Sequence, residues 1–294
     1  RKLFRSNDRG TNWKAISPDL SRSQNRLTLP MMGRVQSVDA AWDLFAMSEY
    51  NNITSIGESP VDENLIYVGT DDGLIQITED GGQNWRKIDL IDGLPKMAFV
   101  NDIKADRFDK DTVYVCLDNH KYGDYQPYVM KSTDRGESWK MINVGIPDRH
   151  LVWRIIQDHE KPGLMFLGTE FGVFATINGG ENWFKFSSGL PVIPVRDLEI
   201  QRRENDLVAA TFGRSFYVLD DYAPLRELTP TTFKDKDFHL FKIKDAKQFP
   251  QADHLGGQKG SQGDSFFAVS NPPYGANFTY YNRDAFKSLK AKRK

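Results

Sequence analysis

Ser6-Asn7-Asp8-Arg9-Gly10-Thr11-Asn12-Trp13 is the first of four copies of one short pattern in this chain. The pattern is Ser or Thr, any residue, Asp or Asn, any residue, Gly, two further residues of any kind, and Trp. The other copies are Thr78-Glu79-Asp80-Gly81-Gly82-Gln83-Asn84-Trp85, Ser132-Thr133-Asp134-Arg135-Gly136-Glu137-Ser138-Trp139 and Thr176-Ile177-Asn178-Gly179-Gly180-Glu181-Asn182-Trp183. Four matches to four constrained positions do not arise by chance, so the chain is built from an internal repeat.

Each constrained position of this pattern, which we call the repeat turn, has a physical role. The Asp or Asn side chain accepts hydrogen bonds from backbone N–H groups of its own turn. The Gly takes a positive φ without steric cost, and the Trp buries a large ring under the turn. We therefore expect a stapled hairpin whose key residues are structural rather than catalytic: Asp8, Trp13, Asp80, Trp85, Asp134, Trp139, Asn178 and Trp183.

Short apolar runs recur at a matching interval. Runs that begin at residues 53, 100, 152 and 195 are 47, 52 and 43 residues apart, and second runs follow them at 65–70, 112–117, 164–169 and 206–211. These runs are rich in β-branched and aromatic residues, as buried strands are. The unit is strand, turn, strand, loop, strand, repeat turn, strand. It predicts an all-β fold, a β-propeller of four-stranded blades.

The blades are expected to span residues 1–227. A half-blade at 1–16 precedes three blades with the repeat turn, and a fourth, at about 195–227, lacks it. The propeller is therefore predicted to be incomplete in this chain, with missing blades from the parent protein or another chain shielding its strands.

Three segments depart from the repeat. Residues 17–50 form a long insertion, in which the spacing of Val35, Val38 and Trp42 predicts a helix. Residues 228–270 mix charge with Gly and Gln, which is typical of a strap or linker. Residues 271–294 look like the truncated start of a following β domain.

Composition excludes several classes of function. A net charge of −1 argues against nucleic-acid binding, and no apolar run approaches the length of a membrane span. The single cysteine, Cys116, excludes an internal disulfide and a cysteine-based metal cluster. The five histidines have no paired spacing, so we expect no metal site and no cofactor. The chain opens without a signal peptide and is expected to be excised from something longer.

The repeat turns resemble the BNR/Asp-box repeats of sialidases, sortilin-type propellers and family 74 xyloglucan hydrolases. Three further stretches resemble large secreted bacterial proteins that are called glycosyl hydrolases with BNR repeats or sortilin-like domains: Leu167 to Leu198, Ala210 to Asp221 and Asn271 to Tyr281. The resemblance covers nearly the whole chain. It implies a secreted or periplasmic fragment of such a protein, and a link to glycans without a particular reaction.

Candidate site residues lie on the first run of each repeat, which is expected to be innermost, where propellers bind ligands. Aligned positions carry polar groups on otherwise apolar elements, and these are Ser55, Asp102, Arg154 and Asp197, with Trp153 and Arg196 adjacent and Arg214 beyond the fourth blade's second strand. Buried charges need partners, so one interpretation is Arg–Asp pairing between blades. A second is a ligand site made by Trp153, Arg154, Arg196 and Arg214. A third is catalysis by Asp102 and Asp197.

Two classes of function follow from these interpretations. The first is a scaffold that binds a glycan or a peptide without cleaving it. The alternative is a glycoside hydrolase, xyloglucanase-like or of another kind, which needs carboxyl groups about 5–5.5 Å apart for retention or about 6.5–9.5 Å apart for inversion. A sialidase is less favoured because the Arg-Ile-Pro signature is absent, although Arg154, Arg196 and Arg214 could supply the required guanidinium groups.

Overall fold

The structure is a computed structural model that describes residues 1–31, 34–35, 37, 51–187, 189–229, 231, 236–249, 274–284 and 288–293. It divides into two compact units, residues 1–226 and 227–294. No helix in these ranges is long and apolar enough to cross a membrane.

The first unit confirms the predicted β-propeller blades. Three antiparallel sheets have four strands each, joined in sequence order, and a fourth sheet has three. Blade 1 holds β5 (Ile53–Glu58), β6 (Ile66–Thr70), β7 (Ile75–Thr78) and β8 (Arg86–Ile88). Blade 2 holds β9 (Phe99–Ala105), β10 (Val113–Asn119), β11 (Asp124–Ser132) and β12 (Lys140–Met141). Blade 3 holds β13 (Val152–Gln157), β14 (Met165–Thr169), β15 (Gly172–Thr176) and β16 (Phe184–Phe186), and blade 4 holds β17 (Val195–Gln201), β18 (Asp206–Thr211) and β19 (Phe216–Leu219).

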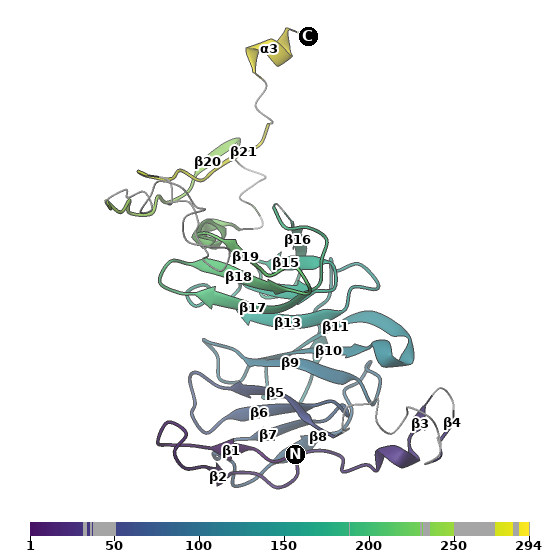
Figure 1. Ribbon diagram of the computed structural model, residues 1–294. Helices are drawn as coiled ribbons and strands as arrows, with labels where there is room; N and C mark the ends of the chain where they lie inside the picture. The colour runs from purple at the N-terminus through teal and green to yellow at the C-terminus, as the bar shows by residue number, and fades with distance from the viewer. Residues whose placement is uncertain are drawn as a thin grey trace, which may run out of the picture. The chain divides into compact units, whose positions relative to one another are not determined.

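The first strands of successive blades, β5, β9, β13 and β17, lie side by side (Figure 1). Apolar clusters fill the space between one sheet and the next. The fit is close enough to require glycine: a Cβ on Gly168 would lie 2.7 Å from the carbonyl oxygen of Val195, and one on Gly69 would lie 2.3 Å from a methyl group of Val100. Packing at this density leaves no room for an added methyl group.

The repeat turns connect the third and fourth strands of blades 1 to 3, and the first copy connects β1 (Phe4–Arg5) to β2 (Lys14–Ala15). In each turn the Asp or Asn accepts a hydrogen bond from the backbone N–H four residues later, at 2.8 to 3.2 Å. The Ser or Thr hydroxyl accepts another from the Gly N–H. The indole N–H of Trp183 reaches the carbonyl of Ile142 on the preceding blade at 2.6 Å, so this turn also fastens one blade to the next.

The insertion at 17–50 is described only in part. Arg26–Thr28 forms a 3-10 turn, and β3 (Pro30–Met31) pairs with β4 (Arg34–Val35). Arg34 and Val35, where the predicted helix was expected to begin, are therefore in a strand. Residues 38–50, which make up most of the predicted helix, lie outside the described residues.

The second unit contains one strand pair and one short helix among its described residues. The strand β20 (Phe238–Leu240) pairs with β21 (Tyr280–Asn282), and α3 spans Leu289–Lys292. The segment expected to be a strap thus contributes a strand. Residues 250–273 lie outside the described residues.

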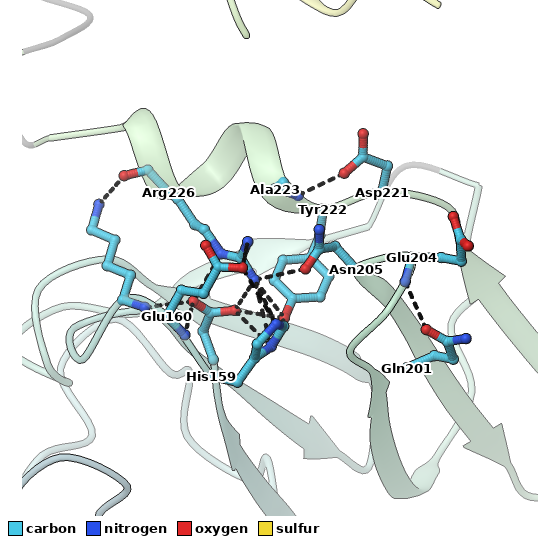
Figure 2. Close-up of polar contacts among 11 residues, drawn as sticks. His159, Glu160, Gln201, Glu204, Asn205, Asp221, Tyr222, Ala223 and Arg226 are labelled. Atoms are coloured by element: carbon cyan, nitrogen blue, oxygen red, sulfur yellow. Dashed lines mark hydrogen bonds and ion pairs between the residues drawn. The ribbon is translucent and has the colours of Figure 1, made fainter. Parts of the chain in front are cut away.

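A polar cluster that we call the clasp fastens the end of blade 4 to blade 3 (Figure 2). Arg226, from the 3-10 helix η3 (Ala223–Glu227), donates two hydrogen bonds to the fully buried carboxylate of Asp158, at 2.9 and 2.7 Å. The Tyr222 hydroxyl donates a third at 2.6 Å, and Glu160 pairs with Arg226 at 2.7 Å. Burial by itself would raise the pKa of Asp158, but the hydrogen bonds from Arg226 and Tyr222 overcome it and lower the pKa to about 2.

Candidate functional site

All four inner strands carry a β-bulge at the same repeat position. The pairing with the second strand skips one residue in each blade, and the skipped residues are Thr54, Asn101, Trp153 and Arg196. A bulge changes the direction of a side chain and is common next to functional sites. Because it recurs in every blade, the bulge aligns four side chains along the inner surface of the sheet stack.

The residue after each bulge forms a bridge between blades. Ser55 accepts a hydrogen bond from the N–H of Ile103 at 2.7 Å, and Asp102 accepts the equivalent bond from Ile155 at 3.1 Å. Blade 3 has Arg154 at this position, and a guanidinium group cannot accept a hydrogen bond. In blade 4 the N–H of Leu198 therefore donates its hydrogen bond to the neighbouring carboxylate of Asp197, at 3.0 Å.

Arg154 joins the two carboxylates that sequence reasoning nominated. Its guanidinium lies 3.4 Å from Asp102 and 3.2 Å from Asp197. Asp102 is 2% exposed and also has Lys104 at 3.7 Å, whereas the side chain of Asp197 is 64% exposed. Burial raises the pKa of Asp102, and the charges of Lys104 and Arg154 act against that rise.

This arrangement bears on the catalytic interpretation. A glycosidase places its two carboxyl groups on either side of the scissile bond, but here Arg154 pairs with both groups. The Asp102 oxygens face a backbone N–H and two cations rather than open space. The geometry favours the pairing between blades, and catalysis by Asp102 and Asp197 stays a prediction.

The bulged side chains themselves divide into two kinds. Thr54 and Asn101 each donate a hydrogen bond to a valine carbonyl of the next blade, at 2.8 Å. Trp153 turns to Glu170 instead, donating its indole N–H at 3.0 Å, and Arg196 lies over the Trp153 ring at 3.6 Å. The bulge position is therefore structural in blades 1 and 2, and in blades 3 and 4 its side chains contact one another.

The guanidinium of Arg196 contacts two aromatic rings, those of Trp153 and Phe212, in an arrangement that we call the arginine stack. The Phe212 ring centroid is 5.7 Å from its guanidinium, and Glu170 is 3.9 Å away. Trp153 is 8% exposed, whereas Phe212 is 69% exposed and the Arg196 side chain 44%. Contacts of a guanidinium with two aromatic faces are favourable and hold the group in a fixed orientation.

The structure therefore brings three of the four predicted ligand-binding residues into contacts on the inner strands. Arg154 is engaged by carboxylates, and Trp153 and Arg196 stack. The fourth, Arg214, is exposed in the β18–β19 turn, and it forms no ion pair within the described residues. Sequence reasoning missed Glu170 and Phe212, which lie in loops after second strands. The one sequence signal for Phe212 is its position as an aromatic residue directly after the apolar run 206–211.

No protein-family model matches the chain, and no curated protein matches it. Among solved structures, the chain is similar to YCF48 bound to a D1 peptide, with 17% identity, a TM-score of 0.44, and coverage of 58% of this chain and 51% of that chain. It is also similar to the GH74 xyloglucanase from Xanthomonas campestris, with 16% identity, a TM-score of 0.48, and coverage of 65% and 32%. An ancestral GH74 enzyme gives 21% identity, a TM-score of 0.44, and coverage of 55% and 22%. The chain thus spans about half or less of each of these proteins, and such likeness concerns the fold alone.

Proposed function

We propose that this chain is a binding module of a secreted or periplasmic protein, and that the arginine stack holds a carboxylate of an extended protein segment without cleaving it. The observation that carries the proposal is the change of role at the bulge. Two blades use this position to hold a neighbouring blade, whereas blade 4 presents there a half-exposed arginine. Departures from a local structural rule concentrate at functional sites.

An acidic ligand group fits the chemistry of the stack. A guanidinium group is a planar fork of N–H donors that matches a carboxylate, and two aromatic contacts fix its orientation. Within the described residues, the guanidinium of Arg196 has only the 3.9 Å contact to Glu170 as an ion pair. The exposed Phe212 ring beside it offers apolar contact to a neighbouring side chain of the ligand.

A peptide suits this surface better than a sugar. Stacking on a sugar requires an open aromatic face. Trp153 is 8% exposed with Arg196 over its ring at 3.6 Å, so Phe212 is the one exposed ring of the arginine stack. The histidine ring of His120 approaches the same indole at its edge, with the centroids 6.0 Å apart. A glycan ligand is therefore the less favoured form of this proposal.

The proposal is tested by probing the protein with a peptide array that pairs Asp- and Glu-containing sequences with their Asn and Gln counterparts. We expect acidic peptides to bind, and Arg196→Gln to weaken binding about tenfold or more, because a hydrogen-bonded charge pair is lost. Arg203→Gln is the matched control, since its side chain is 81% exposed on the β17–β18 turn, at the other end of the strand from Arg196. Equal binding of amide counterparts, or no effect of Arg196→Gln, would overturn the proposal.

A hydrolysis assay on xyloglucan and a glycan array test the competing function. Release of sugar that Asp102→Asn and Asp197→Asn both abolish, with glycan binding retained, would replace the binding module by a glycoside hydrolase. Binding that neither substitution affects, with no sugar released, would support the binding module.

A further inference from the structure

A second polar feature lies at the opposite end of the inner strands, where they run into their first turns. A hollow of about 250 Å³ opens there, and all four blades contribute to its lining. Its charged and polar members are Glu58, Lys104, Arg107, Gln157, Glu199 and Arg202. None of them belongs to the arginine stack. We call this feature the basic hollow.

The two arginines occupy the same position of the repeat. The first turn of every blade is capped by a side chain that accepts a hydrogen bond from the N–H three residues on, and the caps are Ser59, Asp106, Asp158 and Gln201. Arg107 and Arg202 are the residues directly after the caps in blades 2 and 4. The repeat thus directs two guanidinium groups, from two different sheets, to one space.

Neither arginine has a carboxylate partner in the part of the chain that the structure describes. The Nε atom of Arg107 is buried and has no hydrogen-bond partner there. Burial and the charge of Arg202 lower the pKa of Arg107, and the carboxylates of Asp158 and Glu199 act against that lowering. The third cation, Lys104, already pairs with Asp102 at 3.7 Å. A buried polar atom without a partner is uncommon in proteins. Arg202 is exposed, and the three cations of the hollow outnumber its two carboxylates, Glu58 and Glu199, by one.

We propose that the basic hollow binds the oxyanion group of a small hydroxylated ligand, with that group held between Arg107 and Arg202. Carboxylate, phosphate and sulfate share this chemistry, because each offers a pair of charged oxygens that two guanidinium N–H donors can bind. Glu58 and Glu199 border the same space. They repel a second anionic group and accept hydrogen bonds from hydroxyl groups, which favours an acidic sugar-sized ligand over a polyanion. The volume lies just below the usual range of about 300–1,000 Å³ for drug-sized ligands.

The test uses calorimetric titration of the whole chain with three probes: inorganic phosphate, glucuronate and uncharged glucose. We expect at least one of the two anions to bind and glucose not to bind. Phosphate alone would identify a phosphate- or sulfate-bearing ligand, and glucuronate alone a carboxylate-bearing one. Arg107→Gln and Arg202→Gln should each weaken the binding about tenfold or more, whereas Arg203→Gln should leave it unchanged.

Thermal unfolding without ligand provides a second readout. Arg107→Gln removes a half-buried charge that forms no ion pair within the described residues, so the melting temperature of the free protein should stay the same or rise. The anion should raise the melting temperature in the parent protein only. Absence of anion binding in the parent, equal binding to glucose, or equal binding in both arginine variants would overturn the proposal. Because the arginine stack is tested with other residues and other probes, either proposal can fail alone.

Discussion

The clasp offers the sharpest test of how the blades are held together, through the substitution Arg226→Met. Methionine keeps the apolar stem of the side chain and removes its guanidinium. Asp158 then loses hydrogen bonds of 2.9 and 2.7 Å and keeps those from the Tyr222 hydroxyl and from two backbone N–H groups. A fully buried carboxylate is left with His159 as its one remaining ion-pair partner within the described residues, at 3.6 Å, and His159 is charged only when protonated.

The expected loss is about 3 kcal/mol of unfolding free energy, because removing one partner of a buried ion pair costs about 3–5 kcal/mol and three hydrogen bonds to Asp158 remain. The pKa of Asp158 gives a consistent figure. Its value of about 2, against 3.8 ordinarily, corresponds to about 2 kcal/mol in favour of the ionised form in the folded protein. Since that pKa is lowered by folding, the stabilisation is complete above pH 3.8 and is lost as the pH falls through about 2.

Urea unfolding at neutral pH and at several values down to pH 3 measures both effects. Arg226→Met should unfold at a markedly lower urea concentration at neutral pH, and its gap from the parent protein should narrow as the solution is acidified. Arg203→Met is the matched control, because that side chain is 81% exposed. The reasoning is wrong if Arg226→Met and Arg203→Met unfold at the same urea concentration, or if the gap does not change with pH.

Three further predictions concern the repeat. Gly168→Ala should destabilise the protein by about 1–3 kcal/mol in urea unfolding, because the Cβ of the new alanine would lie 2.7 Å from the Val195 carbonyl oxygen. An equal loss of stability from Ala210→Ser, at the same position of blade 4, would contradict this prediction. Trp183→Phe should cost about 1–3 kcal/mol by thermal unfolding, because it leaves the buried Ile142 carbonyl unpaired, whereas Trp13→Phe should cost less than about 0.5 kcal/mol at its 64% exposed site. Hydrogen bonds from the Asn84 N–H and the Ser138 hydroxyl lower the pKa values of Asp80 and Asp134 to about 2. The stabilisation of the fold by these two carboxylates is therefore present above pH 3.8 and lost as the pH falls through about 2. The double variant Asp80→Asn/Asp134→Asn should flatten this part of the stability–pH curve, and an unchanged slope would exclude these carboxylates as its source.

The blades could be predicted from sequence because their chemistry is local. In each repeat turn the hydrogen bonds accepted by the Asp or Asn and by the Ser or Thr join residues at most four apart, so this part of the motif is complete within eight letters of sequence. The inner strands, predicted from 53, 100, 152 and 195, begin at 53, 99, 152 and 195. Apolar runs and turn residues decide these boundaries without reference to distant parts of the chain.

The bulges could not be predicted, because they depend on pairing with a second strand. Trp153 and Arg154 are adjacent in sequence, yet one contacts a loop glutamate and the other two inner-strand aspartates. Regular alternation would place them on opposite faces of the sheet. The β-bulge, which skips Trp153 in the pairing with β14, interrupts this alternation. The sequence of a single strand does not show where its partner strand skips a residue.

The clasp was missed because Asp158 and Arg226 are 68 residues apart, but a sequence signal for it exists. In blade 2 the hydroxyl of Tyr114 donates to the cap residue Asp106. Blade 3 has Phe166 at the position of that tyrosine, which leaves the cap Asp158 without its hydroxyl. Tyr222 supplies the missing group, and its ring lies against Phe166 with the centroids 5.2 Å apart.

The same comparison of equivalent positions separates structural from available polar groups along the whole inner surface. Ser55 and Asp102 each accept a hydrogen bond from the next blade, so these side chains have a structural role. Arg196 does not make the hydrogen bond to the next blade that Thr54 and Asn101 make at the equivalent position. Arg107 follows the cap residue Asp106, whose hydrogen bonds do not involve the Arg107 side chain. Because a repeat provides its own reference, a polar residue that its blade does not need is evidence for a ligand, and such residues occur here at both ends of the inner strands.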